Sequence, residues 1–215
     1  MNKIVECSQE YGLTINVKKT KFMKITKNHN NNRETLTINN RTLEQVDNFT
    51  YLGTMISSTN DYSKEIRIRI EKARTNFNRL RRVLCTRELK LDLRVRIARC
   101  YVFSTLLYGM EAWTLNATTV KKLESFEIWV YRRILKISWT EHVTNNEVMR
   151  RVNKELEIVE TIKTRKLQYL GHFMRGDRYT MLQLIIQGKI QGKRSVGRRR
   201  ISWLRRTFQS SRIQS

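Results

Sequence analysis

A stripe of apolar residues that recurs at alternating steps of four and three constrains this chain more than any other feature. The stripe is formed by Ile66, Ile70, Ala73, Phe77, Leu80 and Leu84. This spacing keeps the side chains on one face of an α-helix, so it predicts a long amphipathic helix that packs against other helices. Proline, which interrupts helices, is absent from the 215 residues. We therefore expect a chain rich in long helices.

The same helical spacing recurs through much of the sequence. It predicts helices over residues 1–11, 63–84, 91–110, 118–137, 145–152, 159–175 and 179–187. Between the first two, alternation of apolar and polar residues predicts a small antiparallel β meander with strands near 13–17, 22–25, 36–38 and 43–46. A two-residue turn is expected at Asn39-Asn40. The predicted fold class is α+β, mainly α: an N-terminal helix and β meander, then a helical bundle and a basic helical tail.

The chain is strongly basic, and the charge is uneven. Lys and Arg number 43 against 19 Asp and Glu, which gives a formal net charge of +24. Residues 62–100 hold 13 basic and 4 acidic side chains, and residues 161–215 hold 14 and 1. Such an imbalance predicts an anionic partner, RNA or DNA. The composition does not distinguish RNA from DNA, and it says nothing of the oligomeric state.

Basic residues also follow a helical repeat on the first long helix. Arg67, Arg74 and Arg81 recur every seven positions, so they form one stripe beside the apolar face. The stripe is widened by Arg69, Lys72 and Arg79. A row of cations suits a phosphate backbone, whereas a merely solvated face usually mixes charges of both signs. The basic tail at 193–206 adds a second candidate surface, although a nuclear localisation signal has the same composition.

The sequence contains no recognisable arrangement of catalytic residues. The aspartates are dispersed and unpaired: Asp47, Asp61, Asp92 and Asp177. Phosphoryl transfer needs carboxylates that converge on Mg²⁺, and no glycine-rich phosphate loop or nucleophile–histidine pair is evident. We expect no catalytic or metal-binding residue, no cofactor and no small-molecule substrate. The apolar run at 101–108 is too short to span a membrane, and no secretory signal begins the sequence, so we expect an intracellular protein, nuclear or cytoplasmic.

Five blocks carry a resemblance to a known family. Residues 11–21 (YGLTINVKKTK) and 49–53 (FTYLG) resemble the last two palm blocks of non-LTR, LINE-like retrotransposon reverse transcriptases. Residues 107–113, 169–175 and 192–203 resemble the thumb and post-thumb of that family. The resemblance implies a palm remnant at 1–57, a helical thumb at 58–138 and a basic post-thumb extension at 139–215, partly disordered after 188.

The resemblance also implies roles for individual residues. Lys19 matches the lysine of the penultimate palm block, and Tyr51-Leu52-Gly53 matches the turn that grips the primer end. The [FY]-x-D-D turn, whose aspartates hold Mg²⁺ in the full-length enzymes, is not among these residues, so we expect a nucleic-acid-binding fragment without polymerase activity. The candidate nucleic-acid-binding residues are Lys19, Lys21, Tyr51, Leu52, Gly53, Arg67, Arg74, Arg81, Arg198, Arg199, Arg200, Arg205 and Arg206. Two alternatives stay open: a helical protein-interaction module, and a decayed transposon product without selected function.

Overall fold

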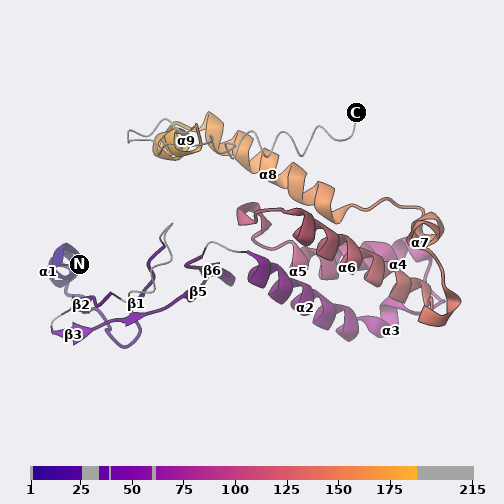
Figure 1. Cartoon of the computed structure of the whole chain (residues 1–215), viewed down its shortest axis with the longest axis horizontal. Helices are drawn as coiled ribbons and strands as arrows, with labels where there is room; N and C mark the ends of the chain where they lie inside the picture. The colour runs from indigo at the N-terminus through magenta and orange to yellow at the C-terminus, as the bar shows by residue number, and fades with distance from the viewer. Residues whose placement is uncertain (1, 26–33, 39, 60–61, 188–215) are drawn as a thin grey trace. The chain divides into compact units, whose positions relative to one another are not determined.

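The computed structural model describes residues 2–25, 34–38, 40–59 and 62–187 (Figure 1). These residues are mainly helical with small β ladders, so the predicted α+β, mainly α class is confirmed. The chain divides into two compact units, Met1–Ile68 and Arg69–Ser215. The boundary falls inside one continuous helix, α2 (Ser63–Arg79). The three domains implied by the resemblance stay predictions.

The first unit contains α1 (Asn2–Glu10), which is followed by Gly12 at a φ of 66°, and its described residues form six short strands. The strands pair two by two, as β1 (Lys21–Phe22) with β4 (Glu44–Gln45), β2 (Thr37–Ile38) with β3 (Arg41–Thr42), and β5 (Asn48–Tyr51) with β6 (Thr54–Ser57). The second pair is antiparallel, as expected. The third is antiparallel as well, but its strands were not predicted. The first is parallel, because the intervening β2–β3 hairpin gives the chain enough length to return in the same direction.

The strand expected at 13–17 does not form, and Asn16 supplies the reason. Its backbone carbonyl accepts the N–H groups of Lys19 (3.1 Å) and Thr20 (2.9 Å), and its side chain accepts from Lys19 as well (3.2 Å). Asparagine competes with strand pairing through such local bonds. The expected turn before β3 is present, with Asn40 at a φ of 59°. Its neighbour Asn39 lies outside the described residues.

The rest of the described chain is helical. After α2 come α3 (Arg81–Leu84), α4 (Leu91–Ala98), α5 (Ser104–Leu106), α6 (Ala117–Leu135), α7 (Asn145–Val152), α8 (Ile158–Arg175) and α9 (Thr180–Gln187). The helix expected at 91–110 contains a π-helical stretch, η1 (Arg99–Phe103), and ends early because Gly109 takes a left-handed φ of 71°. The apolar stripe is buried along α2 and at Leu84, as predicted. At Leu80, where α2 gives way to α3, the backbone departs from helical geometry, with φ −94° and ψ 6°.

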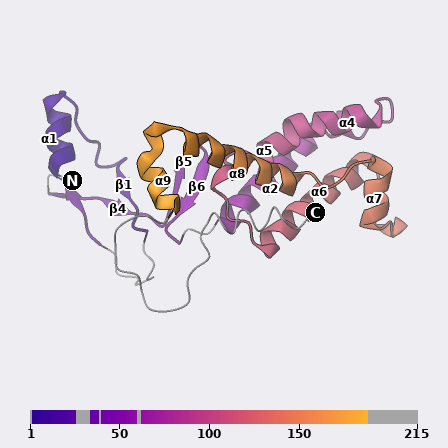
Figure 2. The same cartoon turned by 90° about the horizontal axis from the view of Figure 1, so that it is seen from above.

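Helix α6 is the centre of the second unit. It packs against α4, α7 and α8, as Figures 1 and 2 show. Phe77 of α2 meets Trp129 of α6 edge to face, with ring centroids 5.1 Å apart. The buried side chains of this unit include Val102, Met110 and Trp113. The amphipathic faces read from the sequence therefore meet in one helical core.

A buried carboxylate joins α6 to α8. Glu127 interrupts the apolar face of α6 and is 0% exposed. It accepts hydrogen bonds from the backbone N–H groups of Glu157 (2.8 Å) and Ile158 (3.1 Å) and from the Tyr131 hydroxyl (3.2 Å). The first N–H groups of a helix have no partner within it, so Glu127 caps α8 from outside. Burial raises the pKa of Glu127, although the two backbone bonds oppose that shift.

We predict that Glu127→Ala lowers the free energy of unfolding by about 2–5 kcal/mol, since each buried N–H left without an acceptor costs about 1–3 kcal/mol. Urea unfolding followed by circular dichroism measures the change. Glu124→Ala, on the same helix but only half-buried, is the control and is expected to shift stability by less than about 0.5 kcal/mol. An equal loss in both variants would contradict the capping role.

Candidate nucleic-acid interface

The predicted lysines of the first unit lie near its short strands. Lys19 is exposed in the turn before β1. Lys21, in β1, forms an ion pair with Glu44 of β4 at 2.9 Å. The structure thus places Lys21 on the β1–β4 ladder, which is separate from the β5–β6 hairpin that carries Tyr51.

The expected tight turn at Tyr51-Leu52-Gly53 is present. Leu52 and Gly53 join β5 to β6 with φ values of 47° and 80°, and Tyr51 pairs with Thr54 across the turn. Two positive φ values define the hairpin turn for which Asn-Gly is the favoured pair. Leucine at the first position is unusual, and its side chain is 73% exposed, beside a Tyr51 that is 59% exposed. The hairpin tip therefore presents apolar side chains to solvent on a strained backbone.

The strain at Leu52 can be measured. We predict that Leu52→Asn raises the local free energy of opening of the β5–β6 hairpin by about 0.5–1 kcal/mol, because asparagine tolerates the left-handed conformation. Gly53→Ala should lower it by about 1–2 kcal/mol for the opposite reason. Native-state hydrogen exchange of the hairpin amides reports both changes. Slower exchange in Gly53→Ala, or faster exchange in Leu52→Asn, would show that the turn has another geometry.

The arginines of the predicted stripe differ in their surroundings. Arg67 and Arg81 are exposed, on α2 and α3. Arg74 is half-buried: it pairs with Glu71 at 2.9 Å, and its guanidinium carbon lies 5.5 Å from the ring centre of Trp129. Arg69, expected to widen the stripe, is only 5% exposed and stacks on Tyr108 at 4.5 Å. The solvent-facing row is therefore narrower than the spacing alone predicts.

A cavity of about 560 Å³ in the second unit, at the C-terminal end of α6, gathers cations and aromatic rings. The side chains that matter for its chemistry are Arg81, Trp129, Arg132, Arg133, Lys136 and Trp139. No acidic side chain is among the described residues that line it. Of the predicted site residues that the structure describes, only Arg81 is among those that line this cavity. We call this site the basic–aromatic cavity.

The other residues of the basic–aromatic cavity were missed by sequence reasoning, although a signal was present. The segment 129–139 (WVYRRILKISW) begins and ends with tryptophan and contains three basic residues and no acidic one. On a helical wheel, however, this segment has the pattern of the buried end of an amphipathic helix, which does not indicate a ligand site. Its second tryptophan reaches the cavity because the chain reverses direction after α6.

That reversal is a helix C-cap. Lys136 takes a left-handed φ of 59°, and the N–H groups of Lys136 and Ile137 donate to the carbonyls of Arg133 (3.2 Å) and Arg132 (3.0 Å). This is a Schellman motif, formed here without glycine. Basic residues in the last turn also interact favourably with the helix dipole. The dipole accounts for part of the charge at this end of α6, but not for Arg81, which comes from α3.

The backbone around Trp139 is held by local hydrogen bonds. It begins a 3₁₀ turn, η3 (Trp139–Glu141), whose capping box is formed by Ser138 and Glu141. The Ser138 N–H donates to the Glu141 carboxylate at 2.7 Å, and the Ser138 hydroxyl accepts from the Thr140 N–H at 3.4 Å. The indole is nevertheless 90% exposed. Local hydrogen bonds thus fix the backbone while the ring faces solvent.

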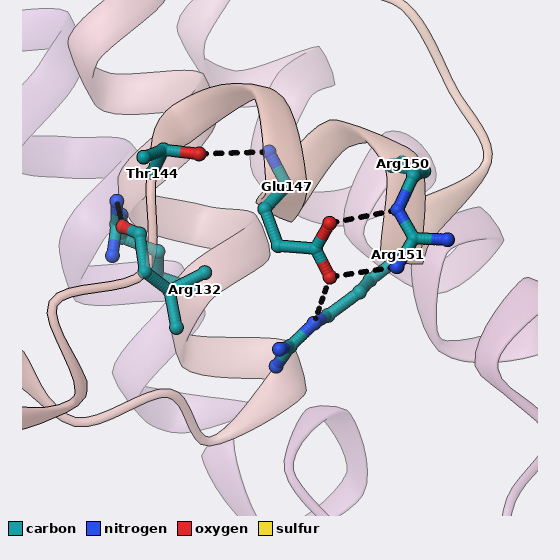
Figure 3. A network of polar contacts seen from close by, with 6 residues as sticks. Arg132, Thr144, Glu147, Arg150 and Arg151 are labelled. Carbon is teal, nitrogen blue, oxygen red and sulfur yellow. Dashed lines mark hydrogen bonds and ion pairs between the residues drawn. The ribbon is translucent and has the colours of Figure 1, made fainter.

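Arg132 ties the cavity to the next helix (Figure 3). Its guanidinium donates to the carbonyl of Val143 (2.6 Å) and to the side-chain oxygen of Asn145 (2.9 Å), at the start of α7. Within α7, Glu147 pairs with Arg150 (2.7 Å) and Arg151 (2.8 Å), and hydrogen bonds from these arginines lower the pKa of Glu147 to about 2. The negative charge of that carboxylate is therefore balanced by two arginines of its own helix.

The remaining expectations concern metals, membranes and the tail. Within the described ranges, no group of three or more His, Cys, Asp or Glu side chains could hold a metal ion. The described helices are all too short or too polar to cross a membrane. Disorder after 188 was predicted for a segment outside the described residues. The same is true of the tail arginines Arg198, Arg199, Arg200, Arg205 and Arg206.

Comparison with known proteins points to a mobile element. The chain is 27% identical over 212 residues to F52C9.6 of Caenorhabditis elegans, whose name describes it as uncharacterized and transposon-derived. The alignment covers 94% of this chain and 74% of that protein. No family model and no solved structure matches the chain. The similarity supports a transposon origin.

Proposed function

We propose that the chain is a fragment of a retrotransposon RNA-directed DNA polymerase, a reverse transcriptase, that binds RNA or DNA without polymerising it. The observation that carries this proposal is the basic–aromatic cavity, where cations from α3 and α6 converge without an acidic neighbour among the described lining residues. The similarity to a transposon-derived protein supports the origin. The function needs no cofactor and is exercised in the nucleus or the cytoplasm.

Charge and geometry favour nucleic acid as the partner. Phosphate groups recur along a nucleic-acid strand, and arginine donates two parallel hydrogen bonds to a phosphate. The cavity brings Arg81, Arg132 and Arg133 together with the exposed ring of Trp139, and such rings stack on bases. The exposed tip of the β5–β6 hairpin is the second contact in this proposal, as the palm-like turn that meets the primer end. Residues 1–57 then correspond to the palm remnant and 58–138 to the thumb.

A protein-interaction module is the second candidate, and α9 favours it. Met181, Leu184 and Ile185 of this helix are all exposed. Exposed apolar side chains on one short helix are typical of a surface that another protein covers. A decayed transposon product would share the structure and lack selected binding. The salt dependence of binding separates the interaction module from the proposed function.

We predict that Arg67→Ala combined with Arg81→Ala flattens the slope of log K against log salt by about 1.5, since each neutralised phosphate contributes about 0.9 on duplex and about 0.7 on single strands. Both arginines are exposed, so the fold should be unaffected; Arg74 is left in place because it packs on Trp129. Fluorescence anisotropy over a salt series makes the measurement. Lys121→Ala with Lys122→Ala, two exposed cations outside the cavity, is the matched control. An unchanged slope in the arginine variant would favour the interaction module.

We also predict that the 215-residue chain incorporates no nucleotide on a primed template with Mg²⁺ or Mn²⁺. Two-metal catalysis needs converging carboxylates, whereas the aspartates here are dispersed: Asp47, Asp61, Asp92 and Asp177. Primer extension with purified protein tests this, with an active reverse transcriptase as positive control and a mock purification as negative control. Template-dependent extension above the mock would refute the inactivity.

A further inference from the structure

Trp139 has the highest exposed fraction of the large hydrophobic residues that the structure describes. Its indole is 90% exposed, whereas Trp113 is completely buried and Trp129 is half-buried. Keeping so large an apolar ring in water forgoes the free energy that its burial would supply. The capping box of Ser138 and Glu141 nevertheless fixes the backbone that presents it. Its position therefore suits contact with a ligand better than it suits packing.

The two tryptophans of the cavity differ in what they can contact. Trp129 is already enclosed: Arg74 and Arg133 approach its ring at 5.5 and 5.6 Å, and Phe77 and Phe126 pack on it at 5.1 and 5.8 Å. It forms the wall of the cavity. Trp139 instead offers an exposed aromatic ring at the same cavity. The site thus combines a stacking surface with the cations Arg81, Arg133 and Lys136.

The chemistry of this combination selects the ligand. The volume of about 560 Å³ lies within the ~300–1,000 Å³ of small-ligand sites. An unpaired base has a face that stacks on an indole, and its phosphate needs cations nearby. The bases of a duplex already stack on each other, and an acidic polypeptide carries the charge without aromatic bases. A single strand satisfies both halves of the site.

We infer that the basic–aromatic cavity binds single-stranded nucleic acid, with one unpaired base stacked on Trp139 and the flanking phosphates on Arg81, Arg133 and Lys136. This inference rests on the proposed function and adds to it a strand type and a contact residue. The contact is independent of base identity, because every base has an aromatic face.

The test compares strands with and without bases on the full chain. Fluorescence anisotropy measures the affinity for oligothymidylate, for an abasic strand of equal length and for a duplex. Trp139→Ala should weaken oligothymidylate binding by about 5- to 150-fold, which corresponds to the ~1–3 kcal/mol of one stacked base. The affinities for the abasic strand and the duplex should not change. Trp139→Phe should retain most of the affinity, and Tyr101→Ala, which removes an exposed aromatic outside the cavity, should retain all of it.

Circular dichroism and thermal unfolding confirm that each variant is folded. Equal affinities of Trp139→Ala and the parent for oligothymidylate would overturn the inference. An equal loss of affinity for the abasic strand would also overturn it, because the indole would then not be stacking on a base. Displacement of oligothymidylate by polyglutamate at equal charge concentration would assign the cavity to an acidic polypeptide. If the parent binds no strand at all, the proposed function fails too; if it binds all strands and Trp139→Ala does the same, only the inference fails.

Discussion

The second unit depends on one buried carboxylate. Glu127 lies inside α6, where an apolar residue would pack at less cost, and the burial of its charge is offset by the two backbone N–H groups at the start of α8. The Tyr131 hydroxyl donates to the same carboxylate, and Glu157 pairs with Arg99 of η1. Three segments of chain therefore meet around this carboxylate: α6, the start of α8 and η1. Apolar packing would tolerate sliding of α8 along α6, whereas directional bonds to a helix terminus admit one register.

The helices were largely predictable because their cause is local. Helix α7 was expected at 145–152 and observed there, since Thr144 accepts the Glu147 N–H as an N-cap and Asn153 ends the helix with a φ of 53°. The strands were predicted less well because most are only two residues long, too short for alternation to be informative. The π-helical stretch at Arg99–Phe103 has no sequence signature, because it depends on how the surrounding helices pack.

The residues of the candidate interface were also predictable only where the signal is local in the sequence. A seven-residue spacing identified Arg67, Arg74 and Arg81, but it could not show that Arg74 stacks on Trp129. The tight turn at Leu52-Gly53 came from a family resemblance, since Leu-Gly carries a weaker hairpin signal than Asn-Gly. The basic–aromatic cavity depends on the reversal of the chain at Lys136, and a non-glycine residue in that conformation is rarely anticipated. Tertiary arrangement therefore decides which of many basic residues share a site.

The bonds of Arg132 have a consequence for the stability of α7. A helix of eight residues is too short to persist alone, so α7 depends on its contacts with α6 and on the anchor of its first turn at Asn145. Arg132 supplies that anchor from the wall of the cavity. A ligand that holds Arg132 in its present rotamer must also favour the folded form of α7. By thermodynamic linkage, unfolding of α7 must lower the affinity of the cavity for that ligand. The folding of α7 and the occupancy of the cavity are therefore thermodynamically coupled.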